Sequence, residues 1–576
     1  MSLIRFPIAV IAMLALASSA PVAASIWDSV PDETVEALGL TRDASTADLY
    51  QGLTKRYKEN LTKGKYADWW EPIPLDTYLA PTLFYEPPQN LKLEVKRDQC
   101  VQCHTELTHG WVKSWQKSAH ANLDEVRALP DDDPRAYKKG MIAEVEENLR
   151  AQGILDGEEK LAEVSCVDCH MGVGVEGGNH AEALRMPDRA VCGQCHVRQF
   201  AEAESELDTQ VWPQDQWAPG HPSHAVDFMA NVELATWAAL PQREVGASCT
   251  LCHNNQTKCD TCHTRHEFSP VEARKPQACA TCHNGVDHNE YEQYMYSKHG
   301  TVYQALGDDW NFDTPLAAAV SEGGMTAPTC AFCHFEYKGE FTHNVTRKVR
   351  WGFLPFKSIV DNLDHPWFEK RKDAWQGTCQ TCHSPRFSKT YLDLADDGIK
   401  DGVDLVEETR EVVQGLYDEG LLVGQKTNRP APPEPVEEGP GAFSSLFMSE
   451  GNNPTMVDRT FAEMWEQHIA RFMKGLQHVN PGGWTYSHGW SDLIKDQTFI
   501  NEQATKLRQQ SDMESRIGKL EESMGSAFNN RDADGRRVAA LGERTYLSAG
   551  LGIIGGGLLI GGLFSLRRCG RRTRTD

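Results

Sequence analysis

Helical patterns dominate the chain, and alternating strand-like runs are scarce. The stretch "DPRAYKKGMIAEVEENLRAQG", which starts at Asp133, is typical of a helix. Residues 404–424 also indicate a helix, and residues 460–479 repeat apolar positions at helical spacing. Residues 499–524 are polar and predict a long helix, whereas the proline-rich stretch 429–441 predicts a loop. The pattern therefore predicts a mainly α protein with little sheet.

Two apolar runs lie at the ends of the chain. At the N-terminus, Arg5 precedes a short apolar run and then small residues, which predicts a signal peptide cleaved after Ala20 or, preferably, Ala24. Residues 546–566 carry no charge and are followed at once by arginines, which predicts a transmembrane helix with a cytoplasmic tail. We therefore expect a periplasmic protein anchored to the inner membrane, or a periplasmic one if the tail is removed.

The composition changes along the chain suggest a domain plan. The fold class expected is a mainly α core rich in cysteine and histidine, followed by a C-terminal helical domain and a transmembrane helix. The expected segments are a signal peptide (1–24), an N-terminal segment (25–97), the core (98–390), a helical domain (391–500), a polar helical stalk (501–545), the transmembrane helix (546–566) and a basic tail (567–576).

The core is predicted from one repeated motif. Cys-x-x-Cys-His is the attachment signature of c-type haem, in which both cysteines form thioethers and the histidine ligates the iron. A zinc ribbon, the alternative, does not need a histidine after every second cysteine. Eight copies use sixteen of the 17 cysteines: Cys100-Cys103-His104, Cys166-Cys169-His170, Cys192-Cys195-His196, Cys249-Cys252-His253, Cys259-Cys262-His263, Cys279-Cys282-His283, Cys330-Cys333-His334 and Cys379-Cys382-His383. The motifs predict that residues 98–390 form a multihaem cytochrome c core with eight covalently bound c-type haems.

Thirteen further histidines are available as second iron ligands. An electron-transfer haem takes a second axial ligand, whereas a catalytic haem needs an open position, so this supply permits a pure electron wire without proving a catalytic haem. Local context favours seven as distal ligands: His120, His180, His224, His266, His299, His343 and His365. His221 competes with His224 for one of these places. We assign His109, His468 and His478 to surface or supporting positions.

The net charge of −24 at pH 7 narrows the choice of partners. Most of the basic excess is confined to the C-terminal tail, so the exported body is acidic. An acidic body argues against nucleic-acid binding and suits a basic redox protein as partner.

The eight motifs, the tight pair formed by the fourth and fifth, and the helical region after the last one resemble octahaem hydroxylamine oxidoreductase. The resemblance implies a homotrimer in which the fourth haem, here that of Cys249, Cys252 and His253, is catalytic and lacks a distal protein ligand. It implies that Asp287 and His288 form the proton-accepting pair of the site. It also implies that Tyr486, in "GGWTYSHGW", crosslinks to the catalytic haem of a neighbouring subunit.

The function implied is oxidation of hydroxylamine to nitric oxide or nitrite. Several electrons leave each substrate molecule, so a chain of bis-histidine haems would carry them to a periplasmic cytochrome c or to membrane quinone carriers. Hydrazine oxidation stays open as an alternative. Nitrite reduction does so too, although the reductive relatives lack the crosslinking tyrosine. A non-catalytic, membrane-anchored electron conduit is the alternative from another class. The membrane anchor departs from the soluble trimer that the family leads us to expect.

Overall fold

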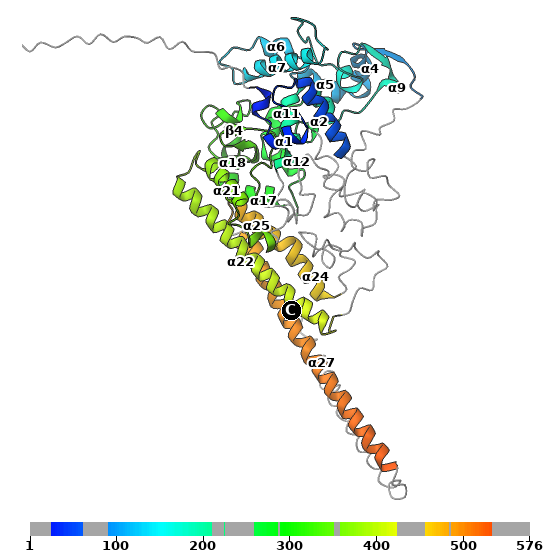
Figure 1. The fold of residues 1–576 in the computed structure, drawn as a ribbon, viewed down its shortest axis with the longest axis vertical. Helices are drawn as coiled ribbons and strands as arrows, with labels where there is room; N and C mark the ends of the chain where they lie inside the picture. The colour runs from blue at the N-terminus through cyan, green and yellow to red at the C-terminus, as the bar shows by residue number, and fades with distance from the viewer. Residues whose placement is uncertain are drawn as a thin grey trace, which may run out of the picture. The chain divides into compact units, whose positions relative to one another are not determined.

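The computed structural model describes residues 25–60, 90–209, 224, 259–285, 289–350, 357–422, 455–482 and 485–532. Within these ranges the chain is mostly helical (Figure 1). The predicted signal peptide, the segment 546–566 and the basic tail lie outside the described residues.

Short helices make up the first part of the chain. Their bounds are η1 Ile26–Asp28, α1 Asp32–Ala37, α2 Thr46–Asn60, α4 Cys100–Leu107, α5 His109–Lys117, α6 Leu123–Arg127, α7 Tyr137–Ala151, α8 Cys166–His170, α9 His180–Ala183, α10 Arg189–Cys195, α11 Val197–Glu204 and α12 Glu206–Thr209. Helix α2 packs against α10 and α11, and Leu49, Leu53 and Phe200 lie in the apolar core between them.

The middle part carries the later haem motifs. Its elements are η9 Cys259–Thr261, α15 Pro270–Ala273, α16 Pro276–Ala280, α17 Glu290–Tyr296, α18 Lys298–Leu306, η10 Gly307–Asp309, η11 Leu316–Ala318, α19 Cys330–Phe335, α20 Lys357–Val360 and α21 Pro366–Cys379. A cluster of buried aromatic side chains, including Tyr294, Trp310 and Phe332, supports this part.

Two small antiparallel sheets brace the loops. Strand β1 (Glu94–Lys96) pairs with β2 (Gly177–Asn179), and β3 (Glu336–Tyr337) pairs with β4 (Glu340–Phe341). Gly177 has a φ of +138°, and a Cβ there would lie 2.1 Å from the carbonyl oxygen of Val95. Only glycine fits this close approach of two strands.

Longer helices follow the last haem motif. They are α22 Pro385–Asp418, α24 Met456–Glu463, α25 Ile469–Gln477 and α27 Ser491–Asp532, with two π-helical turns, η14 Met464–His468 and η15 Tyr486–Trp490. Helix α25 packs against α22 and η15 and buries a continuous apolar face. The chain divides into two compact units at Asn501/Glu502, inside α27, and the described residues of the second unit are mostly exposed.

One part of the predicted fold class is corrected by the structure. In the part of the chain that the structure describes, no helix combines the length and the apolar character needed to cross a membrane. Helix α27 is long enough, but it is polar along its length, and polar and charged side chains cannot be placed in a bilayer core at low cost. Within the described residues the mostly helical architecture with little sheet is confirmed, and it includes no membrane-spanning helix.

Candidate functional site: paired histidines around the haem motifs

Seven of the eight Cys-x-x-Cys-His motifs lie in the described residues, and each sits at or beside a short helical turn. Helices α4, α8 and α19 begin at the first cysteine of a motif, and α21 ends at one. Residues i, i+3 and i+4 share one face of a helix, so a single turn presents both thiols and the imidazole in the same direction. The fourth motif, Cys249-Cys252-His253, lies outside the described residues.

Five motif histidines face a second histidine ring from a distant segment. Two metal–imidazole bonds of about 2.0 Å, with about 1.1 Å from each bonding nitrogen to its ring centre, separate opposed ring centroids by about 6.2 Å. The residues present therefore fit an iron ion between the rings. The centroid separations are 6.1 Å for His196 and His120, 6.4 Å for His170 and His266, 6.2 Å for His283 and His224, 6.0 Å for His383 and His299, and 6.4 Å for His334 and His478.

The other two described motif histidines are also close to a second histidine. Burial lowers the pKa of His104, and the nearby charge of His180 lowers it further. Burial lowers the pKa of His263 to about 4, and His343 is its largest electrostatic neighbour. All seven described motif histidines thus have a second histidine in their surroundings, and for five of them the two rings are in contact.

Burial keeps these imidazoles neutral. It lowers the pKa of His196 and of His334 to about 3, and that of His478 to about 4. The charged form is disfavoured because it loses its hydration in an apolar interior. A neutral ring keeps a free nitrogen lone pair, which is the form of histidine that binds a metal.

A connected, partly open cavity of about 1500 Å³ runs past the second, the third and the fifth to eighth motifs. Cysteines and histidines of these motifs line it together with apolar side chains such as Val191, Phe332 and Leu392. Flat, apolar porphyrins attached at the cysteines would fit such a space.

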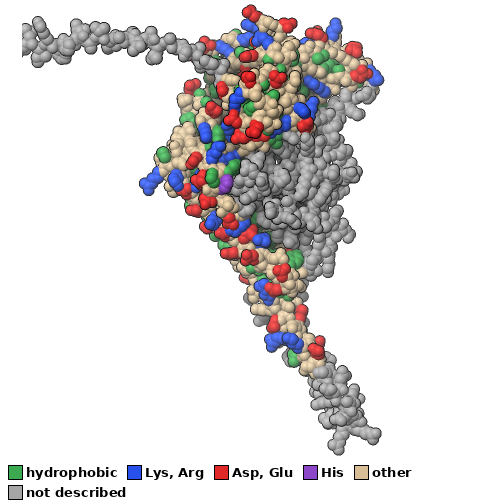
Figure 2. Space-filling view, in the orientation of Figure 1, with side chains coloured by type: hydrophobic (Ala, Val, Ile, Leu, Met, Phe, Trp, Pro, Cys, Tyr) green, Lys and Arg blue, Asp and Glu red, His purple; other side chains and the backbone are tan. Residues whose placement is uncertain are grey.

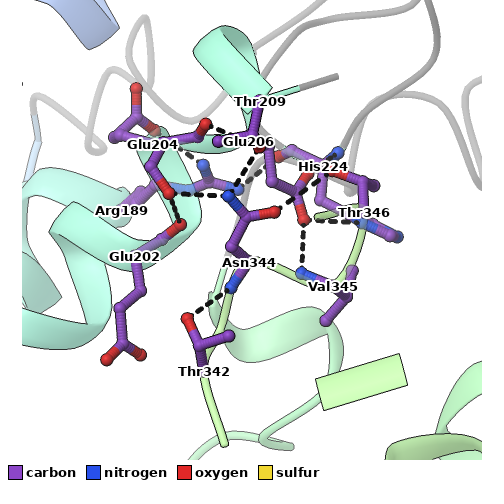
Figure 3. A network of polar contacts seen from close by, with 11 residues as sticks. Arg189, Glu202, Glu204, Glu206, Thr209, His224, Thr342, Asn344, Val345 and Thr346 are labelled. Atoms are coloured by element: carbon purple, nitrogen blue, oxygen red, sulfur yellow. Dashed lines mark hydrogen bonds and ion pairs between the residues drawn. The ribbon is translucent and has the colours of Figure 1, made fainter. Parts of the chain in front are cut away.

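Three buried glutamates on α11 and α12 hold the segments that carry two of the distal histidines (Figure 3). Glu204 pairs with Arg189 at 2.7 Å, and Arg189 also donates to the carbonyl oxygen of His224. Glu206 accepts hydrogen bonds from the backbone N–H groups of His224 at 2.6 Å and Val345 at 3.0 Å.

Asn344 adds a further anchor, because its side-chain amide donates to Ser205 and Thr209 (Figure 3). The turn after β4, which includes His343, is thereby fixed to α11 and α12.

The remaining residues singled out in the sequence have varied positions. Asp287, His288 and His221 lie outside the described residues, as does His253. His365 is the N-cap of α21, where its Nδ1 accepts a hydrogen bond from the backbone N–H of Trp367 at 3.2 Å. Tyr486 begins η15; it is 42% exposed and meets Phe472 edge to face.

Sequence reasoning missed His478, which the structure brings opposite His334. His478 is the C-cap of α25, and its Nδ1 bonds to the carbonyl oxygen of Lys474 at 2.8 Å. No haem motif is near it in the sequence, so the one available signal was its position at the end of a strongly amphipathic helix.

These features define a multihaem c-type cytochrome with covalently attached haems. Residues 162–430 match a family described as seven times multi-haem cytochrome CxxCH. The chain is similar to hydroxylamine-oxidoreductase-like proteins of this class.

Two similar proteins come from Kuenenia stuttgartiensis. One is described as a probable nitrite reductase-hydroxylamine oxidoreductase fusion protein and is 31% identical, over 77% of this chain and 56% of its own length. The chain therefore spans just over half of that relative. The other is a solved structure of a reducing HAO-like protein complex, with a TM-score of 0.63 and 26% identity, over 81% of this chain and 99% of the other.

Proposed function

We propose that this chain oxidises hydroxylamine to nitric oxide or nitrite at the haem of Cys249, Cys252 and His253. The observation that carries the proposal is the second histidine beside each of the seven described motif histidines. Paired imidazoles suit haems that carry electrons, so the fourth motif is the position at which substrate would bind. When bound, the haems supply one-electron redox centres, eight in total.

The chain's own residues have separate roles in this proposal. Asp287 and His288 accept the protons that hydroxylamine loses. Tyr486 crosslinks to the catalytic haem of a neighbouring subunit in a homotrimer. Its 42% exposure on a π-helical turn supports this role, because a partner subunit could reach it.

The proposed electron acceptor is a cytochrome c in the periplasm, to which the chain is exported. On the face shown in Figure 2, acidic and basic side chains are interspersed over the described helices. The net negative charge is therefore not gathered into a single patch on this face, and a basic partner would be attracted mainly by the overall field.

Nitrite reduction is the second candidate function. The description of the solved structure as a reducing HAO-like complex favours it, whereas the fusion protein is named for both activities. The two candidates differ in the direction of electron flow rather than in the arrangement of haems. Hydrazine is a further candidate substrate for the oxidative direction.

The first test is a haem-stained denaturing gel of the purified holoprotein under reducing conditions. Thioethers and a tyrosine–porphyrin bond both survive denaturation. The proposal predicts haem near three chain masses, and it predicts that Tyr486→Phe collapses this band to the monomer. Tyr296→Phe, at a tyrosine that is 63% exposed on α17, is the matched control and should leave the band unchanged.

Turnover assays then separate the candidates. Hydroxylamine or hydrazine is supplied with oxidised cytochrome c, and nitrite is supplied with a reduced viologen. Monomeric haem bands together with faster nitrite consumption would reject hydroxylamine oxidation in favour of the reductase. If no assay shows turnover, the protein is interpreted as a non-catalytic electron conduit.

A further inference from the structure

His343 has a carboxylate against its imidazole. Its Nδ1 lies 3.1 Å from Oε2 of Glu202, and its backbone N–H donates to the same oxygen at 2.9 Å. The Glu202 side chain is only 5% exposed. Its carboxylate points away from the network around Asn344 (Figure 3).

Three other histidines at the haem motifs form hydrogen bonds with neutral groups. The Nδ1 atom of His104 meets the hydroxyl of Thr108 at 2.8 Å, and that of His170 meets the carbonyl oxygen of Arg185 at 3.0 Å. His478 likewise uses the carbonyl oxygen of Lys474. Two others have a carboxylate nearby, but at 3.5 Å: Glu206 beside His224 and Glu290 beside His283.

A buried carboxylate changes what an imidazole ligand can do. It accepts the Nδ1 proton in a strong hydrogen bond, fixes the tautomer so that Nε2 is free for the iron, and makes the ring more basic. The negative charge in a medium of low dielectric also favours the oxidised, more positive iron. Both effects lower the reduction potential of the haem that the histidine ligates.

We propose that Glu202 is a positioning residue that makes the haem of Cys259, Cys262 and His263 a low-potential centre by acting through His343. This rests on two observations: His343 is the largest electrostatic neighbour of His263, and both histidines line one cavity together with Cys259 and Cys262. It does not depend on which substrate is turned over. The haem gains or loses one electron, no bond breaks, and the Nδ1 proton stays on His343. Only the equilibrium between the two oxidation states changes.

The position of this haem indicates how a lowered reduction potential would help electron transfer. Its first cysteine follows His253 of the fourth motif by six residues, so it is the nearest haem in sequence to the proposed substrate haem. A low reduction potential keeps this haem mostly in its oxidised state. They pass outward when substrate is oxidised and are delivered readily to the substrate haem when the flow is reversed.

The test is an anaerobic redox titration of the full holoprotein, followed by electron paramagnetic resonance and without substrate. Glu202→Gln keeps an oxygen acceptor but removes the charge. We expect one haem to become at least tenfold easier to reduce, which is about 59 mV for one electron. Glu202→Asp keeps the charge and should give a smaller shift.

Two further variants make the result specific. His343→Met, which exchanges an imidazole for a thioether, identifies the affected haem because methionine ligation raises the potential. Glu144→Gln is the matched control. Glu144, on α7, pairs with Arg198, which lies on α11 as Glu202 does, and loss of the Glu144 charge should shift none of the potentials.

The outcomes are unambiguous. Unchanged potentials in a fully haem-loaded Glu202→Gln protein would overturn the proposal, as would a shift in a haem other than the one that His343→Met changes. If Glu202→Gln fails to take up haem, the Glu202→Asp titration decides the question, because an unshifted potential with a longer carboxylate distance would also reject it. Failure of hydroxylamine turnover would affect none of these measurements.

Discussion

The imidazole rings of His334 and His478 lie 6.4 Å apart with an angle of 24° between their planes. His334 belongs to the seventh haem motif on α19, whereas His478 ends α25 in the helical region after the last motif. The indole of Trp375 packs against His334 edge to face at 5.3 Å. The C-terminal helices therefore contribute directly to the haem relay and do not merely follow it.

His478→Gly should remove one axial ligand from the seventh haem. We expect one haem equivalent to change from low spin to high spin in the oxidised protein, because glycine leaves the iron one ligand short. Electron paramagnetic resonance measures the change. A spectrum that keeps every low-spin signal would show that His478 does not ligate iron.

His365→Asn should leave all the haem signals in place. His365 caps α21, and asparagine is also a good N-cap residue, so the free energy of unfolding should change by no more than about 0.5 kcal/mol. Electron paramagnetic resonance checks the haem signals, and a urea titration measures the free energy of unfolding. The appearance of a high-spin haem would restore His365 as a distal ligand.

Asp396→Asn should destabilise the protein by about 3 kcal/mol. Asp396 binds both terminal nitrogens of Arg350 at 2.9 Å and also Lys372 at 2.8 Å, and Asp396 and Arg350 are both buried. Loss of the carboxylate charge removes the bidentate ion pair of a buried guanidinium, which is costly in an interior of low dielectric. The free energy of unfolding is measured by urea titration.

Asp393→Asn is the control for that prediction. Asp393 pairs with Lys372 and Lys389 at a side chain that is 41% exposed, where an ion pair contributes less than about 1 kcal/mol. Equal losses in the two variants would contradict the assignment of the Arg350 pair as a buried anchor.

Gly489→Ala should lower the free energy of unfolding by about 2 kcal/mol. A Cβ at Gly489 would lie 2.8 Å from the Cα of Phe472, so η15 would have to move away from α25. Gly482→Ala is the matched control, since its Cβ would meet nothing within 4 Å. Because η15 carries Tyr486, the Gly489 variant should also reduce any haem crosslink on the gel.

The helical character of the protein could be read from the sequence, because amphipathic spacing is a local property. Residues 460–479 show this: the predicted helix is present as α24, η14 and α25. The π-helical turns could not be predicted, since the extra residue that widens a turn is accommodated by packing between distant helices. The transmembrane prediction was drawn from the absence of charge in residues 546–566 and from the arginines that follow them.

The sequence by itself determined where haem is attached, because two thiols and an imidazole at i, i+3 and i+4 lie on one turn whatever surrounds them. Tertiary structure decided which imidazole stands opposite. The second ligand must approach from the other side of the porphyrin, so it comes from a segment whose position depends on packing, as His478 does for His334. The contact between Glu202 and His343 has the same origin: two residues far apart in sequence meet only after α11 and the turn after β4 have packed together.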